Sequence, residues 1–477
     1  MSAPENVDLV RVLADQAFAR SAGSPLTGGN DVELLFDAGE NYPAWEQAIA
    51  CARRAIALEM YIVGRDRTGR RFIELLVERA RAGVAVRVLY DWFGSLGAAA
   101  GGLFAPLEAA GGEVRACARP RLAAPLAMLS RDHRKLLAVD DEVAFVSGLC
   151  MADDWLGRPE RGVAPWRDTG VAIRGPAVGD LWAEFADAWG ACGGALEGVA
   201  LPAPGSIAPR GGVPVRVIGT TPATAKIYRV DLLVASLARE TLWLTDAYFM
   251  GTPVYLESLK NAARDGVDVR LLVPRSSDIP WIATVSRTLY RPLLDAGVRV
   301  YEWDGPMIHA KSAVADGRWA RVGSSNLNLS SLFGNWELDV AIEDEATAEA
   351  LAERFLVDLE GATEVVHGER RKVVLSHSRQ KLRASKARAL GSARGAARYA
   401  ARLGSAVSAA VGRSRPLDAT EAGAVAAVGL VLAVAGALVW LYPALVGVPL
   451  ALLLAWSGCA ALWKAWRLKR RKPAGDA

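Results

Sequence analysis

Two short stretches of the chain place a histidine and a lysine two residues apart, first at His133 and Lys135 and again at His309 and Lys311. Histidine is otherwise scarce, with four in 477 residues. Both pairs fall in apolar runs, and side chains two apart on a strand project to the same face. A fixed positive charge beside a titratable imidazole is suited to holding an anionic phosphate and attacking it. The spacing therefore predicts phosphate chemistry that uses all four side chains.

The likeness between the two stretches continues downstream. An aspartate follows each histidine at the same distance, Asp140 after His133 and Asp316 after His309, and small-residue turns come next. A single His-x-Lys is a weak signal, whereas two copies with matching downstream spacing are a strong one. We interpret the two aspartates as structural residues that tie down strand ends, in preference to direct catalysis.

The motifs belong to a longer internal repeat. Residues 55–91 match 241–274, each with an apolar strand, an amphipathic helix, a glycine turn and a second apolar strand, and residues 104–117 match 290–303. Strands that alternate with helices of roughly 10–15 residues indicate βαβ units. We therefore expect an α/β fold of two pseudo-symmetric lobes, each a mixed, mostly parallel sheet flanked by helices on both faces.

The composition is that of a globular chain with a local excess of basic charge. Hydrophobic residues make up 52% of the chain, which is enough for a core. Residues 1–369 carry 37 Lys and Arg against 49 Asp and Glu, a net of −12, whereas residues 370–415 carry 13 basic and no acidic residues. The acidic balance of the first segment argues against a nucleic-acid channel, which would carry an excess of Lys and Arg.

The five cysteines show no CxxC spacing and no paired framework; they are Cys51, Cys117, Cys150, Cys192 and Cys459. We expect free buried thiols, with neither a disulfide scaffold nor a zinc site. No charged stretch followed by an apolar stretch opens the chain, so we expect no cleavable signal peptide and a catalytic part in the cytoplasm.

Residues 422–463 contain no charged side chain across 42 positions. One membrane-spanning helix needs roughly 20 apolar residues, so this stretch is long enough for two. With a break at Tyr442 and Pro443, we predict a transmembrane helical hairpin. Basic residues flank both outer ends, which places both ends in the cytoplasm by the positive-inside rule. A pair of buried helices in a soluble core is the alternative, which is disfavoured because such helices normally show a polar face.

The basic segment 370–415 has apolar residues at helical intervals, and we expect it to lie along an anionic membrane leaflet. A solvated linker helix or a nucleic-acid tail is the alternative. The expected division of the chain is an amino-terminal extension (1–30), a first lobe (31–200), a Pro/Gly-rich linker (201–213), a second lobe (214–368), a basic juxtamembrane segment (369–420), the hairpin (421–463) and a basic cytoplasmic tail (464–477).

The motifs HRKLLAVD and HAKSAVADGRWARVGSSN resemble the paired HKD motifs of the phospholipase D superfamily, and the resemblance covers about residues 31–365. Narrower features, VELLFDAGENYPAWEQAI, WRDTGVAIRGPAV and GSSNLNLSSLFGNWELDV, resemble bacterial cardiolipin synthases that lack the usual amino-terminal membrane helices. The resemblance implies two lobes that face each other across a pseudo-twofold axis and bring both His-Lys pairs into one phosphate site.

The resemblance also implies roles for individual residues. One histidine attacks phosphorus to give a phosphohistidine while the other moves protons, and by analogy His133 is the nucleophile and His309 the acid and base. Neither a metal nor a cofactor is implied, because the lysines and amide donors stabilise the phosphate oxygens. The carboxylates that support the histidines are matched by Asp168 and Glu337, and the phosphate-binding positions of the second lobe by Ser324 and Asn326.

The first lobe departs from the family pattern. The sequence SGLC supplies Gly148 and Cys150 where a synthase usually reads Gly-Gly-x-Asn. Loss of that asparagine removes a phosphate donor, which costs on the order of 10²-fold in rate if it resembles the loss of one oxyanion donor. We expect Cys150 to be a packed small residue rather than a redox-sensitive thiol.

The function implied by the resemblance is that of a cardiolipin synthase, which moves a phosphatidyl group from phosphatidylglycerol to the hydroxyl of a second phosphatidylglycerol. It implies membrane phospholipids as partners, no nucleic acid, and a bacterial cytoplasmic membrane location with the catalytic part facing the cytoplasm. Two alternatives stay open, a phospholipid hydrolase that uses water and a membrane-anchored lipid-binding pseudoenzyme weakened at Cys150. Aromatic residues such as Tyr61, Tyr248 and Trp281 either line a lipid approach or are ordinary core. The sequence leaves the oligomeric state open.

Overall fold

The structure is a computed structural model that describes residues 3–120, 130–203, 205–366 and 369–372, together with residues 455, 456, 459 and 463. It divides into a larger unit, Met1–Cys117 with Asp132–Val411, and a smaller unit, Ala118–Arg131 with Gly412–Ala477. All of the candidate catalytic residues belong to the larger unit.

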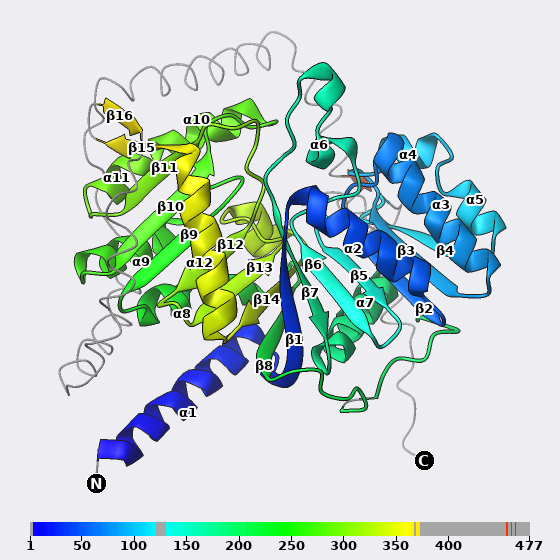
Figure 1. Ribbon diagram of the computed structural model, residues 1–477, viewed down its shortest axis with the longest axis horizontal. Helices are drawn as coiled ribbons and strands as arrows, with labels where there is room; N and C mark the ends of the chain where they lie inside the picture. Colours follow the sequence, from blue (N-terminus) through cyan, green and yellow to red (C-terminus); the bar gives the residue numbers. More distant parts are fainter. Residues whose placement is uncertain are drawn as a thin grey trace. The chain divides into compact units, whose positions relative to one another are not determined.

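The described strands of the larger unit follow one another in a single 16-stranded order, β16-β15-β11-β10-β9-β12-β13-β14-β8-β1-β7-β6-β5-β2-β3-β4 (Figure 1). The strands of the first half are β1 (Thr27–Phe36), β2 (Ala55–Met60), β3 (Ala85–Asp91), β4 (Glu113–Cys117), β5 (Lys135–Val139), β6 (Val143–Ser147) and β7 (Thr169–Arg174). Those of the second half are β8 (Val213–Thr220), β9 (Thr241–Thr245), β10 (Asp268–Pro274), β11 (Arg299–Trp303), β12 (Ser312–Ala315), β13 (Trp319–Gly323), β14 (Glu337–Ile342), β15 (Ala362–Val366) and β16 (Glu369–Lys372).

The two halves repeat one topology. The order β4-β3-β2-β5-β6-β7-β1 of the first half has the counterpart β11-β10-β9-β12-β13-β14-β8 in the second. A short, irregular antiparallel pairing of β1 with β8, in which Thr27 pairs with Val215 and Asn30 with Val213, joins the halves. The internal repeat of the sequence is thus a repeat of strand order as well as of local pattern.

The expectation of mostly parallel sheets is wrong. Four of the 15 described strand pairings are parallel, β2 with β3, β3 with β4, β9 with β10 and β10 with β11, and the other 11 are antiparallel. Parallel neighbours need a crossover helix, whereas strands joined by tight turns return antiparallel. Both motif strands, β5 and β12, begin such hairpins, because the turns at Asp140 and at Asp316 leave no room for a crossover.

Helices cover the sheets in layers. The inner faces of the two halves pack on each other and on α7 and α12 in one apolar core, while α2 and α3 cover the outer face of the first half and α8 and α9 that of the second. Figure 1 shows α12 lying across the strands of the second half. The described helices are α1 (Ala3–Ala22), α2 (Asp37–Cys51), α3 (Arg67–Arg81), α4 (Leu96–Ala100), α5 (Ala105–Ala109), α6 (Asp153–Leu156), η2 (Pro159–Arg161), α7 (Ala177–Gly193), α8 (Lys226–Leu237), α9 (Pro253–Arg264), α10 (Pro280–Thr288), α11 (Tyr290–Leu294), η3 (Ser330–Gly334) and α12 (Glu345–Glu360).

The crossover helix α3 shows how local sequence forms these elements. The Asp66 side chain accepts a hydrogen bond from the Gly69 main-chain N–H and caps the helix. Phe72, Ile73 and Leu76 recur at helical spacing and are buried against the sheet. Gly83, at φ 89°, then turns the chain into β3. The parallel strands β2, β3, β9 and β10 all end at one edge of their sheets, which we call the carboxyl edge.

The cysteines differ from the prediction of free buried thiols. Cys117, at the end of β4, and Cys192, in α7, form a disulfide across 75 residues of sequence. Cys51 is free but exposed, and Cys150 is free and buried. The spacing of the cysteines could not reveal the pair, because it depends on the packing of α7 against the edge strand β4.

Most of the predicted hairpin, and most of the basic segment before it, lies outside the described residues. Within the ranges that the structure describes, no helix is both long enough and apolar enough to cross a membrane.

Candidate active site

Both His-Lys motifs lie at the carboxyl edge. Lys135 is the first residue of β5 and pairs with Met60, the last residue of β2, so His133 stands just beyond that strand end. In the second half, Lys311 directly precedes β12, whose first residue pairs with Thr245 at the end of β9. The repeated topology therefore brings each motif to the same position in its own half.

Main-chain hydrogen bonds join the two motifs across the halves. The His133 main-chain N–H donates to the carbonyl of Trp336 at 2.9 Å, and that of His309 donates to the carbonyl of Arg167 at 2.7 Å. Trp336 and Arg167 immediately precede Glu337 and Asp168, the two carboxylates predicted to support the histidines. Each motif is therefore held by the segment that carries the acid of the other half.

The side chains repeat this crossed pairing. His133 Nδ1 lies 2.9 Å from Glu337 Oε2, and His309 Nδ1 lies 2.8 Å from Asp168 Oδ2. Both carboxylate residues are fully buried. A carboxylate that accepts from Nδ1 holds the imidazole with its Nε2 turned toward a reacting atom. The structure thus brings four of the predicted residues together as two matched pairs.

Further hydrogen bonds hold both carboxylates. Glu337 Oε2 also accepts from the Ser324 hydroxyl at 2.6 Å, and its Oε1 accepts from Asn335 at 3.2 Å. Asp168 Oδ2 also accepts from the Trp155 indole N–H at 2.8 Å. Burial raises the pKa of each carboxyl, but the paired histidine and the nearby lysine outweigh it and leave both pKa values below their ordinary range. Both acids are therefore ionised hydrogen-bond acceptors at neutral pH.

The two lysines are almost fully buried beside their histidines. Lys311 Nζ lies 2.9 Å from His309 Nε2, and each lysine also donates to the main-chain carbonyl of the histidine in its own motif. Desolvation by burial lowers the pKa of Lys311 to about 8, and the Lys135 charge contributes to the shift. Among the described residues neither ammonium group has an ion-paired carboxylate of its own, so the two buried charges together make a site for an anion.

Burial also lowers the pKa of both histidines. It lowers the pKa of His133, with Lys135 adding to the effect and Glu337 opposing it. For His309, burial and the Lys311 charge lower the pKa to about 4, although Asp168 opposes the shift. Both imidazoles are therefore neutral at pH 7 in the free protein, with the proton on Nδ1 facing the carboxylate.

The predicted phosphate-binding residues Ser324 and Asn326 lie at the start of the segment between β13 and β14, at the carboxyl edge. The Ser324 hydroxyl is already hydrogen-bonded within the site, since it donates to Glu337 and accepts from the Leu338 main-chain N–H. Asn326 is buried, and no hydrogen-bond partner for its Oδ1 is found among the described residues. Of the two, Asn326 is the side chain with hydrogen-bonding capacity left over.

The motif aspartates lie at the opposite end of the motif strands from the histidines. The Asp140 carboxylate accepts from the main-chain N–H groups of Arg53, Arg54 and Ala55, and Asp316 makes the equivalent bonds to residues 239–241. Both aspartates have positive φ, 52° and 51°. This geometry anchors the turn after each motif strand to the loop before β2 or β9.

Four aromatic rings surround the histidines. Tyr61 packs on His133 with ring centroids 4.8 Å apart, and Tyr248 packs on His309 at 5.7 Å. Trp155 and Trp166 also contact the His309 ring, at 5.2 and 5.7 Å. Sequence reasoning treated Tyr61 and Tyr248 only as lipid-lining or core residues and missed Trp155. The sequence feature that could have pointed to Trp155 was the nearby WRD stretch, residues 166–168.

Cys150 is a buried thiol near both lysines. Burial raises the pKa of the thiol, even though the Lys135 and Lys311 charges act in the opposite direction. Its main-chain carbonyl accepts a hydrogen bond from Tyr42 Oη at 2.6 Å. The thiol is therefore neutral at pH 7 and offers no amide donor to a phosphate. No grouping of three or more His, Cys, Asp or Glu side chains suited to a metal ion occurs in the part of the chain that the structure describes.

Solved structures with a similar fold come from two other enzymes. Phosphatidylserine synthase from Haemophilus influenzae superposes with a TM-score of 0.59 at 13% identity, covering 74% of this chain and 92% of its own. Polyphosphate kinase from Porphyromonas gingivalis gives a TM-score of 0.50 at 14% identity, covering 79% of this chain and 53% of its own. At these identities the likeness is one of fold.

Sequence comparison is more specific. Residues 234–359 match the family model described as cardiolipin synthase, PLD-like domain. A cardiolipin synthase from Halalkalibacterium halodurans is 32% identical over 353 residues, which cover 72% of this chain and 69% of the relative. One from Clostridium perfringens is 29% identical over 354 residues, covering 72% and 73%. With two His-Lys pairs and their crossed carboxylates in place, the chain belongs to the cardiolipin synthase family of phospholipase D-like proteins.

Proposed function

We propose that this protein transfers a phosphatidyl group from phosphatidylglycerol to the hydroxyl of a second phosphatidylglycerol, releasing glycerol and forming cardiolipin. The observation that carries the proposal is the pair of crossed contacts, His133 with Glu337 and His309 with Asp168, flanked by two buried lysines. Such an arrangement supplies two imidazoles with fixed tautomers and a positive environment for a phosphodiester.

In the first step, His133 Nε2 attacks phosphorus, a P–N bond forms, and the P–O bond to the glycerol headgroup breaks. Glu337 stabilises the positive charge that develops on the His133 ring. His309 protonates the departing glycerol oxygen. His309 is neutral in the free site, so its proton must come with substrate binding, when the negative phosphate offsets the lysine charges that depress its pKa.

In the second step, the hydroxyl of another phosphatidylglycerol attacks the phosphohistidine. His309, now neutral, accepts the hydroxyl proton, the P–N bond breaks, and His133 returns to its neutral form. The ammonium groups of Lys135 and Lys311 and the side-chain amide N–H of Asn326 donate to the non-bridging phosphate oxygens in both steps. One phosphodiester is exchanged for another, so no nucleotide is consumed. Asp140 and Asp316 have a structural role in this scheme.

We also propose the membrane organisation expected from the sequence. The uncharged stretch 422–463 forms a hairpin, residues 370–415 lie along an anionic leaflet, and the division into two lobes joined by residues 201–213 is kept. Flanking positive charge favours a catalytic part in the bacterial cytoplasm. The Cys117–Cys192 disulfide weighs the other way, because cytosolic thiols are normally kept reduced. Labelling of introduced cysteines in intact cells with an impermeant maleimide decides the orientation.

The test is lipid mass spectrometry of the purified protein in detergent micelles with phosphatidylglycerol, beside the His133→Ala and His309→Ala variants. Cardiolipin and glycerol from the wild type, and from neither variant, is the expected result. Phosphatidic acid as the main product would instead show a hydrolase, and no turnover with phosphatidylglycerol or other phospholipids would show a lipid-binding pseudoenzyme.

A further inference from the structure

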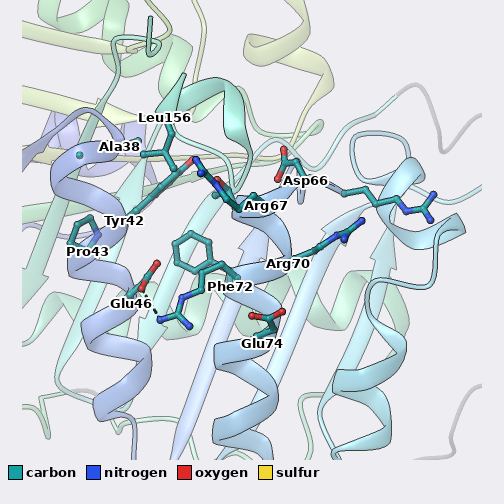
Figure 2. Close-up of a pocket in the computed structure, with 14 residues that line it drawn as sticks. Ala38, Tyr42, Pro43, Glu46, Asp66, Arg67, Arg70, Phe72, Glu74 and Leu156 are labelled. Atoms are coloured by element: carbon teal, nitrogen blue, oxygen red, sulfur yellow. Dashed lines mark hydrogen bonds and ion pairs between the residues drawn. The ribbon is translucent and has the colours of Figure 1, made fainter. Parts of the chain in front are cut away.

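A surface pocket of about 820 Å³ lies in the first half, outside the catalytic cluster of histidines and lysines. Its walls come from the amino-terminal turns of α2, the start of α3 and the end of α6. Figure 2 shows the side chains of α2, among them Tyr42 and Glu46, on one side and those of α3, among them Arg67 and Phe72, on the other. The pocket is therefore built from three elements that converge.

Four arginines line this pocket, at Arg65, Arg67, Arg70 and Arg71. Arg71 is paired with Glu46 at 3.2 Å. No ion pair is found for Arg65, Arg67 or Arg70 within the described part of the chain. Arginine guanidinium groups bind phosphate oxygens through paired hydrogen bonds, so the guanidinium groups of Arg67 and Arg70 are available to a phosphate, whereas that of Arg65 packs against Gly101.

Three carboxylates also line the pocket, those of Glu46, Asp66 and Glu74. Asp66 Oδ1 accepts from the Gly69 main-chain N–H and Oδ2 from that of Asp153, at 2.9 and 2.8 Å. Glu46 is held by Arg71. The four arginines outnumber the three carboxylates of the lining, so the pocket keeps a net positive charge.

Apart from Thr68, the remaining lining is apolar, with Ala38, Tyr42, Phe72 and Leu156 among its residues. A free phosphate ion would gain nothing from such surface, whereas the glycerol and first acyl carbons of a phospholipid would bury against it. The combination of guanidinium groups with an apolar wall fits an anionic phospholipid better than a small inorganic anion.

The position of the pocket gives it access to lipid. α2 begins where β1 ends, opposite Thr169, and α3 follows the end of β2, so both helices start at the carboxyl edge. Exposed large apolar side chains lie in the loops and short helices of the same edge, namely Phe93, Leu96, Ile279, Trp281, Leu329 and Phe333. Exposed apolar side chains that surround a site mark a surface that meets another apolar phase.

The pocket is also connected to a catalytic pair. Tyr42 Oη donates to the carbonyls of Cys150 and Ala152, and Asp153 accepts from both the main-chain N–H and the hydroxyl of Thr68. These bonds fix the chain just before Trp155, whose indole N–H donates to Asp168. The walls of the pocket therefore hold the segment that orients the partner of His309.

We propose that this arginine pocket is a second phosphate site, which binds the headgroup of an anionic phospholipid apart from the catalytic histidines. The choice of a lipid as ligand rests on the proposed function, whereas the phosphate chemistry rests on the arginines alone. A lipid bound here lies against α6 and supports the position of Asp168 without entering the reaction.

The test is site-resolved protection of arginines from phenylglyoxal in the full chain, read by peptide mass spectrometry. The His133→Ala variant is used so that lipid is not consumed and the result does not depend on turnover. The probes are dihexanoyl phosphatidylglycerol, dihexanoyl phosphatidylcholine and inorganic phosphate. At ten times its dissociation constant, a bound ligand slows modification about tenfold.

We expect phosphatidylglycerol to protect Arg67 and Arg70 about tenfold and to leave the exposed Arg53 and Arg81 unprotected. Phosphatidylcholine should protect less at the same concentration. Adding Arg67→Ala and Arg70→Ala together should abolish lipid protection of Arg65, whereas the matched control, Arg53→Ala with Arg81→Ala, should keep it. Equal protection by inorganic phosphate would overturn the lipid assignment, and protection that does not distinguish the two sets of arginines would overturn the site.

Discussion

The crossed pairing of histidines and carboxylates makes a prediction that can be tested without any turnover. The perturbations are His309→Ala, Asp168→Asn and the two together, beside the corresponding set with His133→Ala. In the structure Asp168 Oδ2 lies 2.8 Å from His309 Nδ1, and both side chains are buried. Asp168 should therefore be energetically coupled to His309, in the other half, and not to His133, in its own.

The magnitude follows from burial and charge. A hydrogen bond to a charged group contributes about 1.5–3 kcal/mol, and burial removes the solvent screening that would weaken it. We expect a coupling energy of about 1.5–3 kcal/mol between His309 and Asp168. Residues without a shared bond usually add to within about 0.5 kcal/mol, which is the coupling expected between His133 and Asp168.

The assay is urea unfolding of the detergent-solubilised full chain, followed by tryptophan fluorescence, with the free energy of unfolding compared around each double-mutant cycle. Equal denaturant dependence in all variants is the control for a common unfolding reaction. A third cycle, of His133 with Glu337, should give a coupling similar in size to that of His309 with Asp168, since the His133–Glu337 distance is 2.9 Å. Coupling of Asp168 to His133 and not to His309 would refute the crossed arrangement and the proposed roles of both acids.

Three further predictions concern charge, the motif turns and the disulfide. His309 must gain a proton on substrate binding, so kcat/KM for phosphatidylglycerol should fall about tenfold per pH unit between its pKa of about 4 and pH 8. Above the Lys311 pKa of about 8 the fall should steepen to about a hundredfold per unit, because Lys311 binds an anion only when protonated; a pH–rate profile that keeps one slope to about pH 10 would contradict this. Asp316→Asn should lower the free energy of unfolding by about 1–2 kcal/mol and leave kcat within about twofold. The reason is that the Asp316 carboxylate accepts hydrogen bonds from main-chain N–H groups that are remote from the histidines. A large fall in kcat at unchanged stability would argue for direct catalysis. Cys117→Ser should lower the free energy of unfolding by at most about 4 kcal/mol under non-reducing conditions, because it removes the disulfide. Cys51→Ser, at an exposed free cysteine, is the control and should change it little. Equal unfolding midpoints for the two variants would show that the disulfide does not stabilise the chain.

Local features of the chain were readable from the sequence. The repeated strand-helix-strand pattern predicted two equivalent α/β halves, and the spacing of His133 with Lys135 and of His309 with Lys311 placed each pair on one face of a strand end. Such features depend on contacts within a few residues, and periodicity and spacing record those contacts directly. Membership of the phospholipase D-like family, expected from the motifs, is confirmed by the comparisons.

Strand direction was not readable in the same way. The motif strands β5 and β12 are antiparallel to β2 and β9, although the βαβ pattern predicted mostly parallel sheets. An apolar run has the same composition whichever way it pairs. Only the connection decides, and the short turns at Asp140 and Asp316 required a return in the opposite direction.

What the sequence by itself determined is which side chains are candidates for the chemistry, because their types and spacing are local. Only the tertiary structure decided which residues contact each other. Glu337 contacts His133, Asp168 contacts His309, Trp155 donates a hydrogen bond to Asp168, and Cys117 forms a disulfide with Cys192. These partners are between 13 and 204 residues apart along the chain, as the Trp155–Asp168 and His133–Glu337 contacts illustrate. Contacts at such separations depend on how whole sheets and helices pack, and no local pattern in the chain records that packing.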